Sequence, residues 1–207
     1  FNKYNSVFSR VKILTMEISM FYFIWLAEYI QNQKIFTYLL AINILEAAYL
    51  LEINSPIILN KINGVCLIIS SIFTPNIFYS DDIIQFDDII WGINNSMLLA
   101  TTYIFNSYYK NSYWRISGIY AILIPSIYTI IIQDSMFWGS LRAYSLSITM
   151  IIDSLQPNIH KYISNYNFFD RIQKYKPFVI CINISSTYYL IQHNFPPYIL
   201  QKLFLQN

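Results

Sequence analysis

Long apolar segments alternate with short polar ones along this 207-residue chain. A helix that crosses a membrane needs roughly 20 mostly apolar residues, and seven segments come close to that length and composition. The last of them is short and the third contains Pro75, so either one could be broken or re-entrant. The seven predicted spans are 13–31, 35–53, 62–79, 89–107, 116–133, 136–155 and 177–192.

The positive charges between these segments predict an orientation. Seven crossings leave only Lys34 and Lys202 on one side, while the other side holds nearly all the remaining Lys and Arg. Because inner loops of membrane proteins carry the excess of positive charge, we expect the N-terminus inside and the C-terminus outside. The residues on the inner side are Lys3, Arg10, Lys12, Lys61, Lys110, Arg115, Lys161, Arg171, Lys174 and Lys176.

Composition points to the same class of protein. Hydrophobic residues make up 56% of the chain and charged residues 12%, whereas a typical water-soluble domain has about 25% charged residues. The apolar content excludes intrinsic disorder, and two Cys exclude a disulfide scaffold. We therefore expect an all-α polytopic membrane protein, with about seven transmembrane helices in one bundle and one domain over residues 1–207.

Residues 157–175, between the last two segments, follow a different pattern. Apolar residues recur there at helical spacing, with Lys161 and Lys174 opposite or beside them. This pattern predicts an amphipathic helix that lies in the membrane interface. An aromatic helix docked on a partner subunit explains the pattern equally well.

We select five charged residues inside the predicted spans as candidates: Glu17, Glu28, Glu46, Arg142 and Asp153. Charged groups at that depth are costly and often functional. Glu46 lies deeper in its predicted span than Arg142 does, but long side chains can close the difference, so we expect them to form a buried ion pair between helices. The favoured interpretation is structural, with one ion pair and interfacial carboxylates. The alternative is a proton or ion path through these side chains.

Two clusters of uncharged polar residues interrupt the apolar segments, at 94–96 (Asn-Asn-Ser) and at 183–187, which includes Asn183, Ser186 and Thr187. Such side chains commonly form hydrogen bonds between neighbouring helices. We expect them to hold helices together, and a substrate cavity is the less favoured alternative.

No motif for catalysis, metal binding or cofactor binding is evident. His160 and His193 fall on opposite sides of the predicted membrane, and the spacing of Cys66 and Cys181 matches no metal site. The sequence therefore predicts a protein that is not an enzyme and has no catalytic residues. We expect no metal, no cofactor beyond bound structural lipids and no nucleic-acid partner.

The expected function follows from this absence and from the abundance of Ile, Tyr, Asn and Phe, which indicates an A/T-rich genome. We expect a structural or assembly subunit of a large energy-transducing complex, of the mitochondrial respiratory chain or the ATP synthase. Its partners would be membrane lipids and other membrane subunits, and its location the mitochondrial inner membrane, or else a bacterial or other cellular membrane. The alternative function is a small channel or transporter for ions, protons or a solute.

Overall fold

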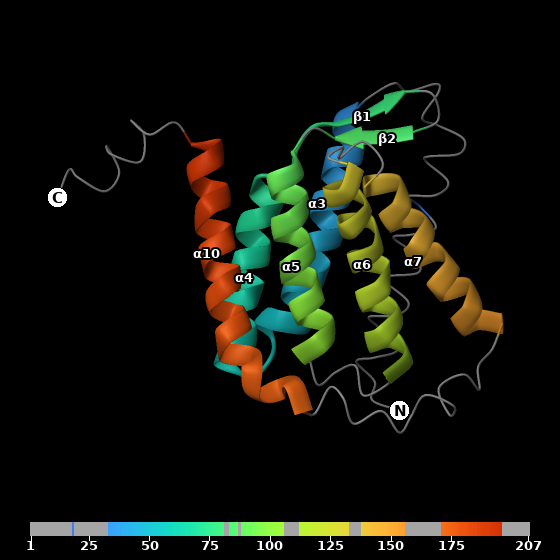
Figure 1. The fold of residues 1–207 in the computed structure, drawn as a ribbon. Helices are drawn as coiled ribbons and strands as arrows, with labels where there is room; N and C mark the ends of the chain where they lie inside the picture. The colour runs from blue at the N-terminus through green and yellow to red at the C-terminus, as the bar shows by residue number, and fades with distance from the viewer. Residues whose placement is uncertain are drawn as a thin grey trace.

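The structure of the protein is a computed structural model. This structure describes residues 18, 33–80, 83–86, 88–105, 112–132, 138–155 and 171–195. These residues are mainly helical, and the long helices lie side by side with a short hairpin at one end (Figure 1). Apart from residue 18, the predicted segment 13–31 lies outside the described residues, and so does most of the predicted amphipathic helix 157–175.

The first described helix, α3 (Gln33–Ala47), continues directly into a π-helix, η2 (Ala48–Ile53). A short turn then leads into α4 (Ile58–Ile72), where the Ser55 hydroxyl accepts hydrogen bonds from the Ile57 backbone and the Asn60 amide at 3.3 and 2.9 Å. The helix stops shortly before Pro75, as expected because proline disfavours helical geometry in the residue preceding it.

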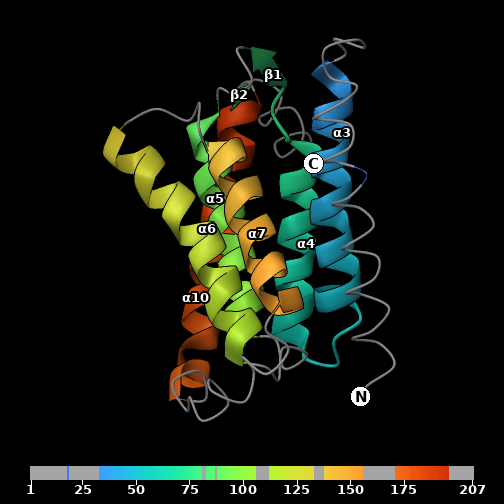
Figure 2. The same cartoon turned by 90° about the vertical axis from the view of Figure 1, so that its right-hand side faces the viewer.

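A two-stranded antiparallel hairpin follows, formed by β1 (Ile77–Ser80) and β2 (Ile83–Phe86). The register pairs Ile77 with Phe86 and Ser80 with Ile83. β1 overlaps the end of the predicted span 62–79, and β2 lies between that span and the next one, 89–107. The hairpin contacts α3 and α7 at one end of the helices (Figures 1 and 2).

The remaining helices are α5 (Ile89–Phe105), α6 (Ser112–Ile132), α7 (Trp138–Leu155) and α10 (Lys176–Asn194), the last preceded by a 3-10 turn, η3 (Gln173–Tyr175). In α10 a proline at the second position suits a helix start, because the first turn leaves backbone N–H groups unpaired in any case. α5 has a central position and packs against α4, α6 and α10, while α7 packs on α6 and α3 packs on α4.

The apolar core lies between these helices. Trp91 of α5 and Trp138 of α7 meet edge to face, with ring centroids 6.0 Å apart. Both indoles are almost fully buried, and each has a hydrogen-bond partner: Trp91 Nε1 donates to the Ser70 carbonyl at 2.7 Å and Trp138 Nε1 to the Ser126 hydroxyl at 3.2 Å. The core cluster consists of Ile44, Ala48, Cys66, Leu67, Trp91, Leu98, Trp138 and Leu190.

The prediction of a seven-span membrane bundle is wrong for the part of the chain that the structure describes. No described helix combines the length and the apolar composition that crossing a membrane requires. α3 and α4 have 15 residues each, which gives about 22 Å at 1.5 Å per residue against a hydrocarbon layer of about 30 Å. In α10 the polar side chains of Asn183, Ser185 and Ser186 interrupt the apolar sequence.

This finding also overturns the predictions that depended on membrane spans. The predicted inside–outside orientation is not supported. The same holds for the predicted location in the mitochondrial inner membrane or another membrane, and for the assignment to a membrane complex of the respiratory chain. What the structure supports is a mainly helical protein.

Candidate functional site

Of the five predicted site residues, the structure describes the side chains of two, Glu46 and Arg142. Glu17 and Glu28 lie outside the described residues, as does the side chain of Asp153, whose backbone belongs to α7. Glu46 is half-buried on α3, and Arg142 is half-buried on α7.

The Arg142 guanidinium has a defined partner across the helix interface. Its Nη1 donates a hydrogen bond to the Ala121 carbonyl of α6 at 3.2 Å, and the Ser145 hydroxyl donates to the same carbonyl at 3.0 Å. Arg142 therefore helps to join α6 to α7. The predicted pairing of Glu46 with Arg142 is tested by no contact described here and stays a prediction.

Uncharged polar side chains form a connected group between α4, α5 and α10, which we call the polar seam. The expectation that the clusters 94–96 and 183–187 hold helices together is confirmed for Asn94, Asn183 and Ser186 by hydrogen bonds between helices. The Asn183 amide of α10 donates to Asn63 Oδ1 of α4 at 2.7 Å and to the Thr101 hydroxyl of α5 at 2.8 Å. The seam comprises Asn63, Ser70, Asn94, Thr101, Thr102, Asn183, Ser186 and Thr187.

Asn94 connects the other end of the seam. Its carbonyl oxygen accepts a hydrogen bond from the Ser186 hydroxyl at 2.6 Å, and its amide nitrogen donates to the Ser70 hydroxyl at 3.3 Å. The seam thus fixes the position of α10 against α4 and α5 through directional contacts. Hydrogen bonds of this kind specify which residues face each other, whereas apolar packing alone is tolerant of small shifts.

Glu52, which the sequence analysis did not select, lies at the end of the seam. Its side chain is 2% exposed. The π-helix places it there, since a π turn carries an extra residue and changes which side chains face the neighbouring helix. Gly64 of α4 leaves the necessary space, because an added Cβ at that position would lie 2.8 Å from the Glu52 Cβ.

The Glu52 carboxyl is poorly supplied with hydrogen bonds. Oε1 accepts one long bond of 3.4 Å from the Asn63 amide, which also donates to the Leu98 carbonyl and the Thr102 hydroxyl, and Oε2 has no partner among the described residues. Burial raises the pKa of Glu52 to about 7, and the polar contacts with Thr102 and Asn63 and the positive charge of Lys176 offset only part of that effect.

Lys176, the first residue of α10, is the buried positive charge near Glu52. It is 6% exposed, and its Nζ donates to the Phe105 carbonyl at the end of α5 at 3.3 Å. Burial lowers the pKa of Lys176, and the negative charge of Glu52 acts in the opposite direction. An acid and a base whose pKa values shift toward each other form a site that can take up or release a proton near neutral pH.

A second group of buried polar atoms lies where α5 meets α6. The Ser126 hydroxyl donates to the Ser96 hydroxyl at 2.6 Å and accepts from the Trp138 indole. Beside this pair, Asn95 is 1% exposed and Thr129 3% exposed, and neither side chain has a hydrogen-bond partner within the described part of the chain. An unpaired buried amide typically costs about 1–3 kcal/mol.

The sequence contained a weak signal for Glu52 and little for Lys176. Glu52 lies one residue before the end of an apolar segment, which Asn54, Ser55 and Pro56 follow, a position that resembles a boundary where water reaches a carboxylate. Lys176 was counted with the basic loop residues that flank it. Their proximity depends on the return of α10 along α4 and α5, which a local pattern does not reveal.

The site offers a carboxyl group, an amine and several amides and hydroxyls. In the described ranges, no group of three His, Cys, Asp or Glu side chains is arranged to hold a metal ion. No family model, curated protein or solved structure matches the chain.

Proposed function

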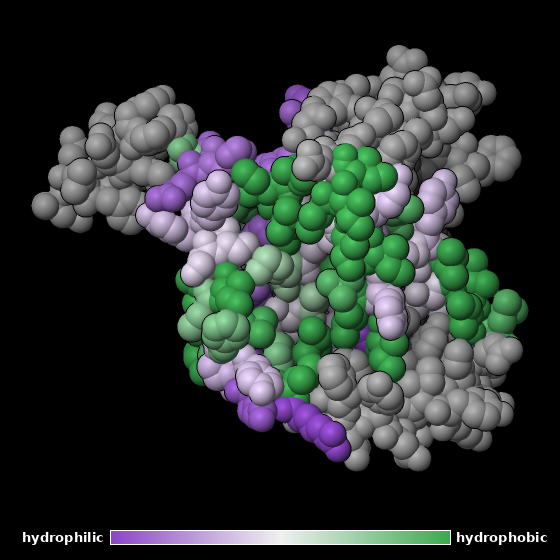
Figure 3. All heavy atoms as spheres, in the orientation of Figure 1, coloured by the Kyte–Doolittle hydropathy of each residue, from purple (hydrophilic) through white to green (hydrophobic). Residues whose placement is uncertain are grey.

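We propose that this protein is a non-catalytic helical subunit of a multi-protein assembly, which it joins through apolar helix faces. The observation that carries the proposal is the number and size of the apolar side chains on the outside. On the outer side of α6, Ile131 is 74% exposed, and at the end of α7 Leu155 is 76% exposed. Figure 3 shows apolar side chains along α6 on the face in view.

The exposed side chains continue along both helices at helical spacing. α6 exposes Tyr120, Leu123, Ile124, Ile127, Tyr128, Ile130, Ile131 and Ile132, and α7 exposes Tyr144, Ile148, Ile151, Ile152 and Leu155. Large continuous apolar surfaces are uncommon on proteins that act alone, and they mark surfaces that another molecule covers. We call these residues the α6–α7 face.

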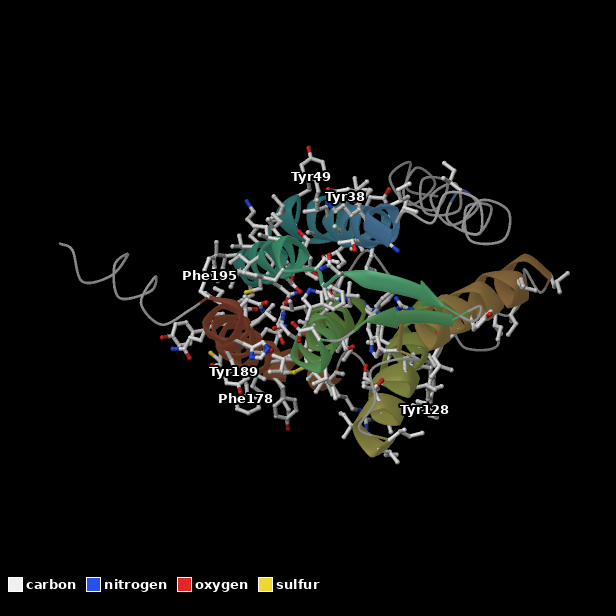
Figure 4. The ribbon with its side chains drawn as sticks, turned by 90° about the horizontal axis from the view of Figure 1, so that it is seen from above. Tyr38, Tyr49, Tyr128, Phe178, Tyr189 and Phe195 are labelled. Atoms are coloured by element: carbon white, nitrogen blue, oxygen red, sulfur yellow. The ribbon has the colours of Figure 1, made fainter. Side chains whose placement is uncertain are left out.

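Aromatic side chains on other helices support the same interpretation. Seen along the helices in Figure 4, Tyr38, Tyr128, Phe178 and Tyr189 project outward from three different helices. Tyrosine combines a large apolar ring with a hydrogen-bonding group, which is why it is enriched where proteins meet. Partner chains that contact more than one side of the protein are consistent with this arrangement.

The interior supports a structural role rather than catalysis. The polar seam ties α10 to α4 and α5, and the Arg142 and Ser145 contacts tie α7 to α6. A subunit that positions its neighbours needs this kind of fixed internal geometry, because interface contacts are lost when helices shift relative to each other.

Photo-crosslinking tests the proposal. Benzoylphenylalanine placed at Tyr128 or at Tyr144 lies on the α6–α7 face, whereas the same group at Lys61 replaces an exposed charged residue on α4. We expect Tyr128 and Tyr144 to yield adducts with the same partner protein in the native particle, and Lys61 to yield none with that protein. Adducts with lipid or detergent alone at both positions would contradict the proposal.

A further inference from the structure

Two buried ionisable side chains from distant parts of the sequence, one on η2 and one at the start of α10, influence each other. Glu52 and Lys176 are separated by most of the described chain, yet they are 2% and 6% exposed and act on each other electrostatically. Buried charges of this kind are costly unless they are paired or neutralised. How the two groups share charge is therefore a property of the fold.

The surroundings of Glu52 favour its neutral form. One carboxyl oxygen accepts a long bond of 3.4 Å from Asn63, Thr102 provides a further polar contact, and the other oxygen has no partner among the described residues. A buried carboxylate normally needs several short hydrogen bonds or a direct ion pair to remain charged. Asn63 cannot turn fully toward Glu52, because its oxygen is held by Asn183 at 2.7 Å.

Lys176 is held by a different partner in this state. Its Nζ donates to the Phe105 carbonyl at 3.3 Å and lies 6.0 Å from the centroid of the Phe105 ring. Phe105 is the last residue of α5, so this carbonyl lacks an acceptor role within the helix, and a positive charge there also complements the helix dipole. Lys176 thus has one partner in place and a second one, Glu52, within electrostatic range.

Other ionisable residues lie on the elements around η2 and around the start of α10. The helices that pack on η2 are α3 and α4. Among the described residues, Lys176 is the charged group whose positive charge lowers the pKa of Glu52. The ionisable residues on the neighbouring elements are Lys34, Tyr38 and Glu46 on α3, Tyr49 on η2, Lys61 and Cys66 on α4, Tyr103 on α5, and Lys174 and Tyr175 on η3.

We propose that Glu52 and Lys176 form a proton-operated latch between η2 and the first turn of α10. While the carboxyl is neutral, Lys176 caps the end of α5 at Phe105. When the carboxyl releases its proton to solvent, the carboxylate attracts the Lys176 ammonium, which keeps its own proton and leaves the Phe105 carbonyl. The start of α10 then moves with Lys176. This inference does not depend on the proposed function.

The latch is tested first by following the carboxyl itself. In protein with 13C-labelled glutamate carboxyls, NMR should show one resonance that titrates with a midpoint near the pKa of about 7 given by burial of Glu52. The resonance should be missing in Glu52→Gln, which has nearly the same shape. Absence of any titrating carboxyl between about pH 6 and 8, or its persistence in Glu52→Gln, would overturn the proposal.

The partner is tested by changing the charge of Lys176. Lys176→Met removes the positive charge that favours the carboxylate, so the Glu52 midpoint should rise by on the order of one pH unit. Lys176→Arg keeps the charge and should leave the midpoint close to that of the wild type. If Lys176→Met leaves the midpoint unchanged, the two groups do not form a latch.

Movement of α10 needs its own measurement. Hydrogen exchange of the backbone amides in the first two turns of α10 should change across the same pH range in the wild type, and should not change with pH in Glu52→Gln beyond the intrinsic chemistry. Amides of α7, whose main contacts are with α6 and β2, serve as the internal reference. A wild-type α10 whose protection follows the α7 reference at every pH would contradict the latch, even if Glu52 titrates as expected.

Discussion

Replacing Glu52 by glutamine should make the stability of the protein less dependent on pH. The folded state raises the pKa of Glu52 from 4.5 to about 7, so the folded protein binds this proton more tightly than the unfolded chain does. The resulting stabilisation is complete below about pH 4.5 and is lost as the pH rises through 7. A shift of roughly 2.5 units corresponds to about 3 kcal/mol in the free energy of unfolding.

Glutamine resembles the neutral carboxyl in shape and polarity, so the variant keeps the low-pH environment at every pH. We expect Glu52→Gln to match the wild type at pH 4 within about 0.5 kcal/mol, and to be more stable than the wild type by about 3 kcal/mol at pH 8. Urea unfolding at a series of pH values, followed by the fluorescence of the buried indoles, measures both differences.

Glu46→Gln is the matched control for this prediction, because it makes the same chemical change on the adjoining helix α3. The fall in stability that Glu52 causes between pH 4 and 8 should persist in that variant. If Glu52→Gln is less stable than the wild type at pH 8, then Glu52 is a stabilising carboxylate and the reasoning from its burial and its hydrogen bonds is refuted.

Two further predictions concern packing inside the bundle. Gly118→Ala should destabilise the protein by about 1–2 kcal/mol in urea unfolding, because an added Cβ would lie 2.4 Å from the buried Tyr103 ring. The better helix propensity of alanine offsets at most about 1 kcal/mol of this cost. An unchanged stability would mean that the ring moves freely. Asn95→Leu should stabilise the protein by about 1 kcal/mol or more, since it removes a buried amide that has no partner among the described residues. Asn94→Leu is its control and should be destabilising by about 2 kcal/mol, because Ser186 and Ser70 lose their partner; similar effects of the two changes would contradict the assignment.

The positions of the helices could be predicted well from the sequence, whereas their environment could not. Long apolar segments predicted helices near 35–53, 89–107 and 177–192, and the structure has α3 with η2, α5 and α10 there. An apolar helix of 15–20 residues has nearly the same sequence pattern whether it faces lipid or other helices. For this reason, the hydropathy of each segment predicted a membrane span, although the helix packs against other helices.

The hairpin at Ile77–Phe86 was missed for a related reason. Apolar residues that follow Pro75 were assigned to a span, although the proline ends α4 and the chain then forms extended strands. Two strands of four residues carry too little alternation to be recognised.

The candidate site was predictable only in part. The seam residues Asn94 and Asn183 stood out as polar positions in apolar segments, and a role in helix contacts followed from general experience with such side chains. Glu52 and Lys176 are each at the end of an element, where exposure is the usual state. Their burial results from the π-helix and from Gly64, which lets η2 approach α4 closely.

The central claim is that the protein works as a subunit whose apolar faces are covered by partner proteins. The most direct measurement is the mass of the native particle, purified under mild conditions with and without the double change Ile127→Ser and Ile131→Ser on the α6–α7 face. We predict a particle with defined additional protein chains for the wild type, and loss of at least one of those chains for a variant whose helical content is unchanged. A wild-type particle that contains this 24.5 kDa chain alone would contradict the claim.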